Sequence, residues 1–282
     1  MNKTAIALGT FDGVHLGHRA VIEATVSSGF NPVAVVFKFP PKMYFDGKNE
    51  LLMTFSDKKQ ALIGMGFDEV VALDFETLRD NSPQQFLDFL LEEYNPAIIS
   101  CGFNYRFGKN GAGDTALLQE FCNKKGIHLK ICDAITKDGV TVSSTLIRKL
   151  LKQGEIEKAN ALMQNPFSFT SKVTHGDKRG RTLGFPTINQ KYPEDLVKIK
   201  FGVYKTKVLI GERSYVGITN VGMRPTFESE YVISETYIKD FSGDLYGKDV
   251  KIVLEKFIRE EIRFSSVEEL KIQMEKDLNY IK

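Results

Sequence analysis

Two of the four histidines in this 282-residue chain lie three positions apart, in the stretch LGTFDGVHLGHRAVIEA at residues 8–24. The stretch joins an apolar run to a helical pattern, so His15 and His18 fall on one face of a first helical turn. The free N–H groups and the dipole of a helix start attract anions. Imidazole donors beside them can bind phosphate oxygens and stabilise the charge that develops during displacement at phosphorus. The pattern therefore favours phosphate chemistry here.

The glycines of this turn support the same interpretation. Gly9, Gly13 and Gly17 allow the backbone to approach a bulky ligand closely. The turn is not a Walker A loop, because G-x-x-x-x-G-K-[ST] is absent from it. Two simpler interpretations remain open: one histidine caps the helix while the other is solvated, or the pair binds a metal. No cluster of acidic or cysteine ligands accompanies the pair to favour the metal.

A second candidate segment is VSSTLIR, residues 142–148. Ser143, Ser144 and Thr145 are expected to cap a helix start, with Arg148 one turn further in. Hydroxyls, free N–H groups and a guanidinium fork can then converge on the oxygens of a leaving pyrophosphate. Ordinary helix capping is the alternative.

The most specific stretch of the second half is THGDKRGRTLGFPTINQ, residues 174–190. Glycines mixed with cations suit a polyphosphate. The residues concerned are Gly176, Gly180 and Gly184 with Lys178, Arg179 and Arg181. Thr187 and Asn189 follow at i, i+2, so in a strand they share a face. Their neutral oxygens suit Mg²⁺ when nucleotide phosphates supply the charge. The alternative is a basic hairpin followed by an edge strand.

Glu235, in VISETYI, is the candidate base. If this segment is a strand, Ile233, Glu235 and Tyr237 share a face, and desolvation among apolar neighbours raises the pKa of the carboxyl group. A carboxylate of this kind can take a proton from a hydroxyl. A glutamate satisfied by backbone groups, or simply solvated, is the alternative.

Two different patterns of secondary structure, one in each half of the chain, are expected to position these residues. Up to about residue 160, strand patterns alternate with helical ones, which predicts an α/β domain with a parallel sheet covered on both faces. Ligands of such sheets bind at the carboxyl ends of the strands. The expected strands are 4–8, 32–37, 68–75, 97–102 and 128–132, and the expected helices are 17–28, 56–66, 82–94 and 114–126.

Beyond residues 164–166 the strand patterns follow one another without helices. They predict a closed antiparallel β-barrel with one terminal helix laid on it, at 265–281. We therefore expect two domains, 1–162 and 163–282. The barrel strands are expected at 167–174, 202–210, 214–221, 232–238 and 250–258.

Composition excludes several classes of function. A chain with 42% hydrophobic and 26% charged residues is typical of a globular protein. The net charge of +2 argues against coating nucleic acid or a membrane surface. We see no secretory signal and no run near the ~20 apolar residues that span a bilayer. Cys101, Cys122 and Cys132 form no C-x-x-C pair, which favours reduced thiols in a cytoplasm.

Motifs of the first half resemble a known family. GTFDGVHLGH is similar to the signature of Rossmann-like nucleotidyltransferases with an H-x-G-H turn, which transfer an adenylyl group from ATP to a phosphate and release pyrophosphate. VSSTLIR resembles their S-S-x-x-I-R element, and CGFNYRFGKNGAGD at 101–114 resembles a loop that helps to hold flavin and nucleotide. The resemblance implies catalytic roles for His15 and His18. It implies nucleotide binding by Gly9, Phe11, Asp12, Gly17, Asn104, Arg106, Ser143, Ser144 and Arg148.

One motif departs from that family. Its members often have P-H-P after the second strand, whereas this chain has Phe39 at the histidine position of KFPPKMYF. We interpret Phe39 as a wall of the flavin pocket, together with Phe107.

The second half resembles riboflavin kinases, through GRTLGFPTIN, NVGMRPT, SETYIKDFSGDLYG and IREEIRF. The resemblance implies a magnesium site at Thr187 and Asn189, and Glu235 as the base that activates the ribityl 5′-hydroxyl. It implies that a closing segment covers the flavin and that a basic loop holds the nucleotide. The residues are Arg259, Glu261 and Phe264 for the flavin, and Gly176, Lys178 and Arg181 for the nucleotide.

Over almost its whole length the chain therefore resembles the bifunctional bacterial riboflavin kinase/FAD synthetase family. This implies ATP as co-substrate, Mg²⁺, and riboflavin, FMN and FAD as substrates and products, with no nucleic-acid or membrane partner. Two alternatives stay open. H-x-G-H also resembles the aminoacyl-tRNA synthetase signature, and a flavin-binding protein with one or both sites inactive would carry the same motifs.

Overall fold

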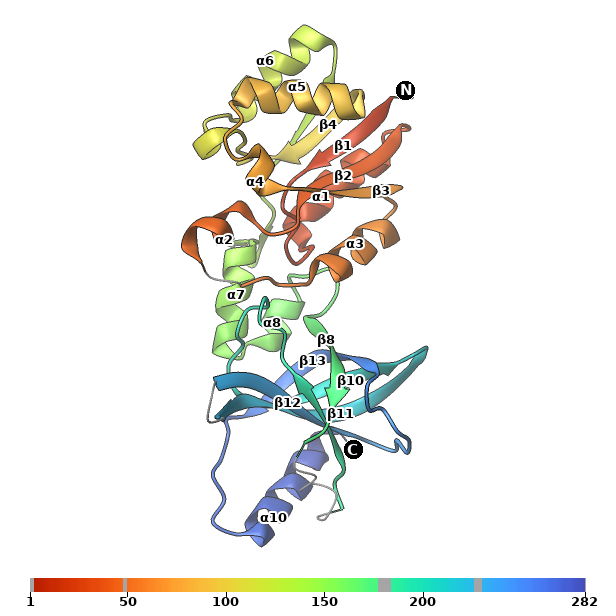
Figure 1. Ribbon diagram of the computed structural model, residues 1–282, viewed down its shortest axis with the longest axis vertical. Coiled ribbons are helices and arrows are strands. Elements are labelled where there is room, and N and C mark those ends of the chain that lie inside the picture. Colours follow the sequence, from red (N-terminus) through yellow and green to blue (C-terminus); the bar gives the residue numbers. More distant parts are fainter. Residues whose placement is uncertain (1–2, 48–49, 177–183, 226–229, 282) are drawn as a thin grey trace. The chain divides into compact units, whose positions relative to one another are not determined.

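The chain forms two compact units, seen in the computed structural model of Figure 1. The first comprises residues 1–146 with 162–165, and the second comprises 147–161 with 166–282. The structure describes residues 3–47, 50–176, 184–225 and 230–281. Within these ranges no helix is both long and apolar enough to span a bilayer.

The first unit is built on a five-stranded sheet whose pairings are all parallel, in the order β3-β2-β1-β4-β5. This confirms the predicted α/β class. β1 lies in the centre, with Leu8 opposite Val35 on β2 and Cys101 on β4, so three strands end at one edge. The strands are β1 (Thr4–Leu8), β2 (Asn31–Phe37), β3 (Glu69–Leu73), β4 (Pro96–Gly102) and β5 (His128–Cys132).

Helices cover both faces of this sheet (Figure 1). Ile6 and Leu8 pack with residues of α5 (Pro83–Tyr94) and α6 (Thr115–Lys125). Ala7, which points to the opposite face, packs with residues of α1 (Leu16–Val26) and α3 (Phe55–Gly64). The short elements are α2 (Pro41–Asp46), α4 (Phe75–Leu78), η1 (Lys109–Gly111) and the two-stranded β6 (Thr136–Lys137) and β7 (Val140–Thr141).

The division between the units falls within α7 (Ser144–Gln153). The rest of α7 and α8 (Ile156–Asn160) group with the second unit. Asn160 explains this grouping, because its Nδ2 donates to the carbonyl of Leu254 (2.8 Å) and its Oδ1 accepts from the N–H of Phe167 (2.8 Å). One amide side chain thus fixes α8 to two strand-forming segments of that unit.

The second unit is a closed barrel with antiparallel pairings, in the order β10-β11-β12-β9-β8-β13. The predicted barrel is confirmed, and α10 (Val267–Leu278), followed by η2 (Asn279–Ile281), is its terminal helix. The strands are β8 (Ser168–Thr174), β9 (Thr187–Lys191), β10 (Gly202–Ile210), β11 (Arg213–Pro225), β12 (Glu230–Ile238) and β13 (Asp249–Arg259).

Buried side chains alternate with more exposed ones along β12 and along parts of β11 and β13, as closure of a barrel requires. The hydroxyl of Thr219 hydrogen bonds with those of Thr206 and Thr236, at 2.9 Å each, and all three side chains are fully buried. Phe169 and Tyr204 are also fully buried. Because these residues fill the interior, their strand neighbours must face outward, and the site described below consists of such neighbours.

Phe169→Ala should lower the free energy of unfolding of the barrel unit by about 3–5 kcal/mol, because it opens a cavity among fully buried side chains. Thr170→Ala is the matched control, since Thr170 is exposed on the same strand and should cost less than about 0.5 kcal/mol. Chemical denaturation followed by circular dichroism measures both. Equal effects of the two changes would contradict the assignment of the inner face.

Candidate active sites

The H-x-G-H turn lies at the carboxyl end of β1, and His15 occupies the N-cap of α1. The N–H of His18 donates to the carbonyl of His15 (2.8 Å), and the N–H of His15 donates to Nδ1 of His18 (3.2 Å). The two rings stack with centroids 3.6 Å apart. Because Nδ1 of His18 accepts, the proton of the neutral ring is on Nε2. His18 thus keeps one donor for a ligand.

The pKa of His18 lies well below its usual 6.5. Burial is the main cause, and the nearby charges of His15 and Lys58 lower the pKa further. At neutral pH the ring is therefore a neutral donor and not an imidazolium ion.

The backbone around the histidines is held in an unusual conformation. Phe11 and Val14 have φ values of +47° and +37°, which are costly for residues other than glycine, above all for a β-branched one. Segment 162–165 supports the turn, because Gln164 N–H donates to Val14 O (3.0 Å) and Leu16 N–H to Leu162 O (2.9 Å). A Cβ on Gly17 would lie 3.0 Å from the ring of His15. The absence of a side chain at Gly17 therefore leaves room for the ring of His15.

A cavity of about 410 Å³ opens beside the turn at the carboxyl edge of the sheet. Its wall combines polar groups of four loops with apolar side chains such as Phe37, Leu73 and Phe103. This is the composition of a small-molecule site. The structure brings together here, from the predicted set, His15, His18, Gly9, Phe11, Gly17, Asn104, Arg106, Ser143 and Ser144.

Two of the predicted nucleotide-binding residues do not line this cavity. The carboxylate of Asp12 is buried and accepts from the N–H of Leu52 (2.9 Å), while its carbonyl accepts from the hydroxyl of Ser144 (3.0 Å). Asp12 therefore ties the turn to the start of α7 and to the segment before α3. Arg148 lies one turn beyond Ser144 along α7.

The two phenylalanines predicted for the flavin pocket also lie away from the cavity wall. Phe107 is buried in the core, 5.7 Å from the ring of Phe86. Phe39 is half-buried against Tyr44, 6.3 Å away. The aromatic cavity residues that sequence analysis did not single out are Phe37, Phe103 and Tyr105.

Lys58 is a further residue that sequence analysis missed. Its side chain is buried on α3, and its Nζ donates to the carbonyls of Thr10 (3.0 Å) and Phe37 (2.9 Å). Burial lowers the pKa of this ammonium group to about 8, against the raising effect of Asp12. The one sequence signal is its position four residues before buried Leu62, on the inner side of the helix.

On the barrel, the predicted residues form a row across neighbouring strands. Glu235 of β12 stands opposite Asn189 of β9 on one side and Asn220 of β11 on the other. Tyr237 stands opposite Thr187. Glu235 therefore has amide neighbours across the sheet in addition to the side chains along its own strand.

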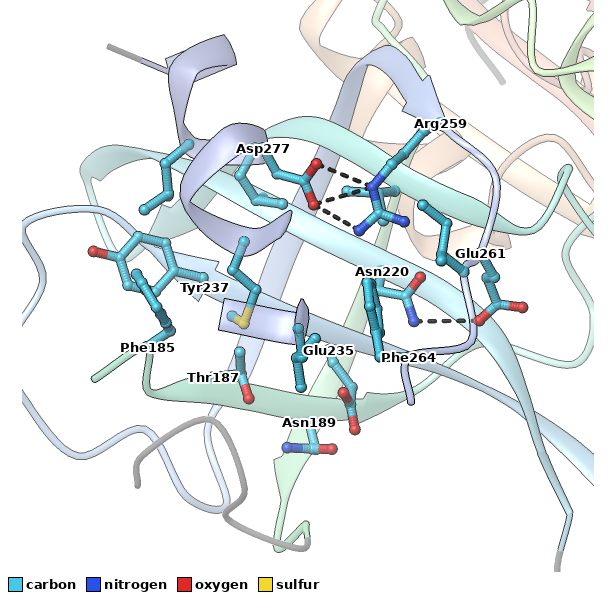
Figure 2. Close-up of a pocket in the computed structure, with 16 residues that line it drawn as sticks. Phe185, Thr187, Asn189, Asn220, Glu235, Tyr237, Arg259, Glu261, Phe264 and Asp277 are labelled. Atoms are coloured by element: carbon cyan, nitrogen blue, oxygen red, sulfur yellow. Dashed lines mark hydrogen bonds and ion pairs between the residues drawn. The ribbon is translucent and has the colours of Figure 1, made fainter. Parts of the chain in front are cut away.

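These side chains face outward, into a cavity of about 320 Å³ between the barrel and α10. Figure 2 shows Thr187, Asn189 and Glu235 close together, with Phe185 and Tyr237 at one end. The Phe185 and Tyr237 rings meet edge to face, with centroids 6.0 Å apart. The remaining wall is largely apolar: Val203, Ile218, Ile262, Phe264, Leu270, Met274 and Leu278.

Asn189 suits a cation in this cavity. Its Oδ1 is buried and has no hydrogen-bond partner among the described residues, and a Cβ on Gly176 would overlap its side chain. Such an unpaired oxygen can coordinate a cation, and the hydroxyl of Thr187 on the same strand face can supply a second ligand. The described residues contain no cluster of three or more histidine, cysteine or acidic side chains that would bind a metal unaided. Lys178 and Arg181 lie outside the described residues.

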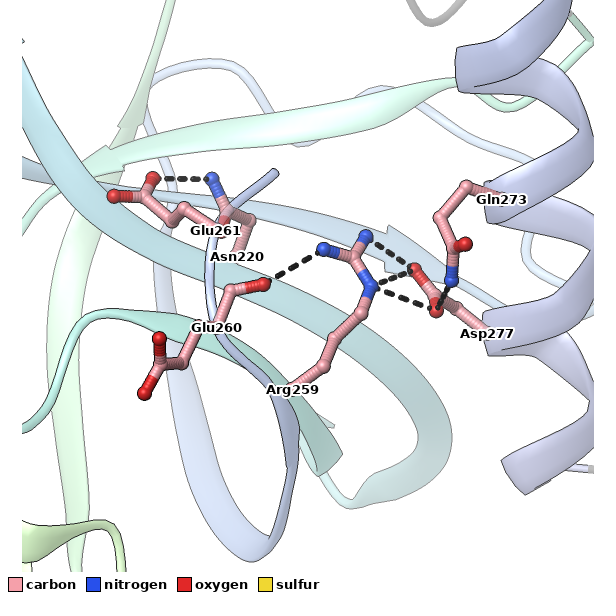
Figure 3. A network of polar contacts seen from close by, with 6 residues as sticks. All are labelled: Asn220, Arg259, Glu260, Glu261, Gln273 and Asp277. Carbon is pink, nitrogen blue, oxygen red and sulfur yellow. Dashed lines mark hydrogen bonds and ion pairs between the residues drawn. The ribbon is translucent and has the colours of Figure 1, made fainter. Parts of the chain in front are cut away.

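The closing segment connects the end of β13 to α10 (Figure 3). The guanidinium of Arg259 binds the buried carboxylate of Asp277 with Nε (3.0 Å) and Nη2 (2.7 Å), and Nη1 donates to the carbonyl of Glu260 (2.9 Å). Gln273 donates to the same carboxylate (2.8 Å). Arg259 therefore holds α10 over the cavity that it lines.

Glu261 and Phe264 also line this cavity. The carboxylate of Glu261 accepts from Nδ2 of Asn220 (3.3 Å) and lies where a Cβ on Gly222 would be. The glycine thus makes room for the closing segment against β11.

A parallel sheet with a histidine turn at its carboxyl edge, followed by a barrel with a second cavity that is largely apolar and carries a row of polar side chains, is the architecture expected of a two-domain transferase. The FAD synthetase family matches residues 1–146, and the riboflavin kinase family matches residues 163–282. The chain belongs to the bifunctional riboflavin kinase/FMN adenylyltransferase family.

Relatives match along nearly the whole chain. The bifunctional riboflavin kinase/FMN adenylyltransferase of Listeria monocytogenes is 35% identical, over 98% of this chain and 90% of its own length. That of Escherichia coli K12 is 34% identical, over 96% and 90%. A crystal structure described as a macrolide-efflux protein from Streptococcus pneumoniae has a TM-score of 0.90 and 27% identity, over 99% of this chain and 93% of its own.

We expect His18 to remain neutral at pH 6.5, with its proton on Nε2, because burial and neighbouring charges lower its pKa. Between pH 6.5 and the lower pKa of folded His18, the unfolded chain binds more protons than the folded one. The free energy of unfolding should therefore fall as the pH is lowered from 6.5 toward that pKa. NMR titration of ring nitrogens measures the pKa, and His18→Gln identifies the resonance. Protonation of His18 at or above pH 6.5 would contradict the expectation.

Proposed function

We propose that the outward-facing barrel cavity is where the chain phosphorylates riboflavin with ATP to give FMN. The observation that best supports this proposal is the position of Glu235 between Asn189 and Asn220 on neighbouring strands, in the wall of a largely apolar cavity. A flat aromatic ligand suits a slot of this kind. Glu235 accepts the proton of the ribityl 5′-hydroxyl as its oxygen attacks the γ-phosphorus of ATP and ADP leaves.

Thr187 and Asn189 are the residues that would hold Mg²⁺ beside Glu235. The buried acceptor of Asn189 supports this proposal, as does the position of Thr187 in the wall of the same cavity. When bound, the ion would neutralise charge on the nucleotide phosphates. The basic loop with Gly176, Lys178 and Arg181 is proposed to bind the same phosphates, and Arg259, Glu261 and Phe264 to cover the flavin from α10 and the closing segment.

Asn189→Leu should slow riboflavin phosphorylation at least about tenfold and raise the Mg²⁺ concentration for half-maximal rate, because it removes a ligand oxygen while keeping the shape. Lys191→Met is the matched control, since Lys191 is exposed two residues along the same strand. Initial rates across a Mg²⁺ series measure both. A normal Mg²⁺ dependence in Asn189→Leu would rule out this metal site.

The cavity of the parallel-sheet unit is proposed as the site where FMN attacks the α-phosphorus of ATP to give FAD and pyrophosphate. His18 donates through Nε2, and His15 holds the stacked pair at the helix start. Because both are positioned before substrate binds, they stabilise developing charge without reorganisation. Gly9, Phe11, Gly17, Asn104, Arg106, Ser143 and Ser144 form the surrounding wall, and Phe37 and Phe103 are the proposed flavin contacts.

We assign the two activities to domains 1–162 and 163–282, with riboflavin, FMN and ATP as small-molecule partners. A cytoplasmic setting is supported by three buried, unpaired cysteines.

Incubation with riboflavin, ATP and Mg²⁺ should give FMN and then FAD, as followed by chromatography. Glu235→Gln should slow FMN formation by about 10²–10⁴-fold and spare FAD formation from supplied FMN. His18→Ala should do the reverse, by about 10²–10³-fold.

Each variant is the other's control, since both reactions are measured on one chain. FMN without FAD would mean that the first site is inactive, as a flavin-binding protein with a degenerate site predicts. Unchanged riboflavin would overturn the kinase assignment. Loss of both activities in either folded variant would contradict two independent sites.

A further inference from the structure

The buried ammonium group of Lys58 lies where β1 and β2 separate. Their last paired residues are Leu8 and Val35. Thr10 and Phe37 stand two residues beyond that pair, and Lys58 donates to both carbonyls, at 3.0 and 2.9 Å. One side chain of α3 thus joins the diverging ends of two adjacent strands.

Thr10 and Phe37 both line the cavity of the parallel-sheet unit, whereas Lys58 itself does not. Thr10 immediately precedes the Phe11–Val14 turn that leads to the histidines, and Phe37 is an aromatic wall residue. Without the ammonium group, the buried carbonyls of Thr10 and Phe37 would lack a hydrogen-bond donor. The backbone would have to shift to give them another one. A shift of Lys58 would therefore move two parts of the cavity wall together: Thr10, on the proposed nucleotide side, and Phe37, on the proposed flavin side.

The charge of Lys58 reaches the histidine pair as well. The charged and titratable groups around it are Asp12, from the turn, and His18, from α1. His18 is in turn faced by His15. A cation fixed beside His18 disfavours a second positive charge on the imidazole.

We propose that Lys58 is a positioning residue for adenylyl transfer, which sets the distance between the H-x-G-H turn and the flavin-side wall and places a fixed cation beside His18. This inference rests on the proposed adenylyl site in the same cavity. Lys58 contacts no substrate in this scheme, because it acts through Thr10, Phe37 and His18.

The experiment compares Lys58→Met with Lys59→Met in the full chain. Lys59 is the matched control, since it is exposed on the same helix. Lys58→Met should slow FAD formation from FMN by about ten- to a hundredfold, while riboflavin phosphorylation by the same molecules is unchanged and Lys59→Met resembles the wild type. The acid limb of the pH–rate profile of FAD formation should move to higher pH, because removing the neighbouring cation raises the pKa of His18.

Lys58→Gln, which keeps a polar group but no charge, gives the same two readouts if Lys58→Met does not fold. An unshifted acid limb together with a wild-type rate in either folded variant would overturn the inference. A lower rate with an unshifted acid limb would overturn the role toward His18. If the wild type itself forms no FAD, the proposed function fails instead, so the two failures are distinguishable.

Discussion

The histidine turn of the first unit depends on hydrogen bonds to the backbone polar groups where β1 leaves the sheet. A parallel strand that ends in a buried environment leaves N–H and C=O groups that water cannot reach. Here they are bound by a buried ammonium, by a serine hydroxyl of α7 and by segment 162–165. Because each of these donors comes from a different part of the chain, the histidine turn is fixed from several sides.

This constraint explains how unfavourable torsion angles persist at Phe11 and Val14. A left-handed valine costs free energy that local interactions do not return, so the surrounding contacts must hold it. The same contacts place His18 in the cavity wall and keep most of its ring away from water. Desolvation then makes the ring a neutral donor, and a fixed neutral donor suits a reaction in which negative charge moves between phosphate oxygens.

The barrel reaches a comparable result by a different route. Its interior is filled by threonine, aromatic and aliphatic side chains, so the row of Asn189, Glu235 and Asn220 lies outside, where α10 covers it. The lid is held by the bidentate contact between Arg259 and Asp277, which links the end of β13 to the last turn of α10. The chain thus carries two cavities, one lined by imidazoles and one by a carboxylate between amides, and we propose displacement at phosphorus in each.

Much of this could be predicted from the amino-acid order alone. Hydrophobic periodicity is a local property, and it located the five parallel strands, the barrel and the terminal helix. Spacing of two residues in a strand correctly put Thr187 beside Asn189 on one face, and spacing of three in a helix put His15 beside His18. Other features depend on contacts between distant residues. Only the folded chain turns Asp12 toward Leu52, buries Phe107 in the core, pairs Arg259 with Asp277 and places a helical lysine under two strand ends. A residue type states which bonds a side chain can make, but tertiary packing decides which partner is within reach and how much water remains around it.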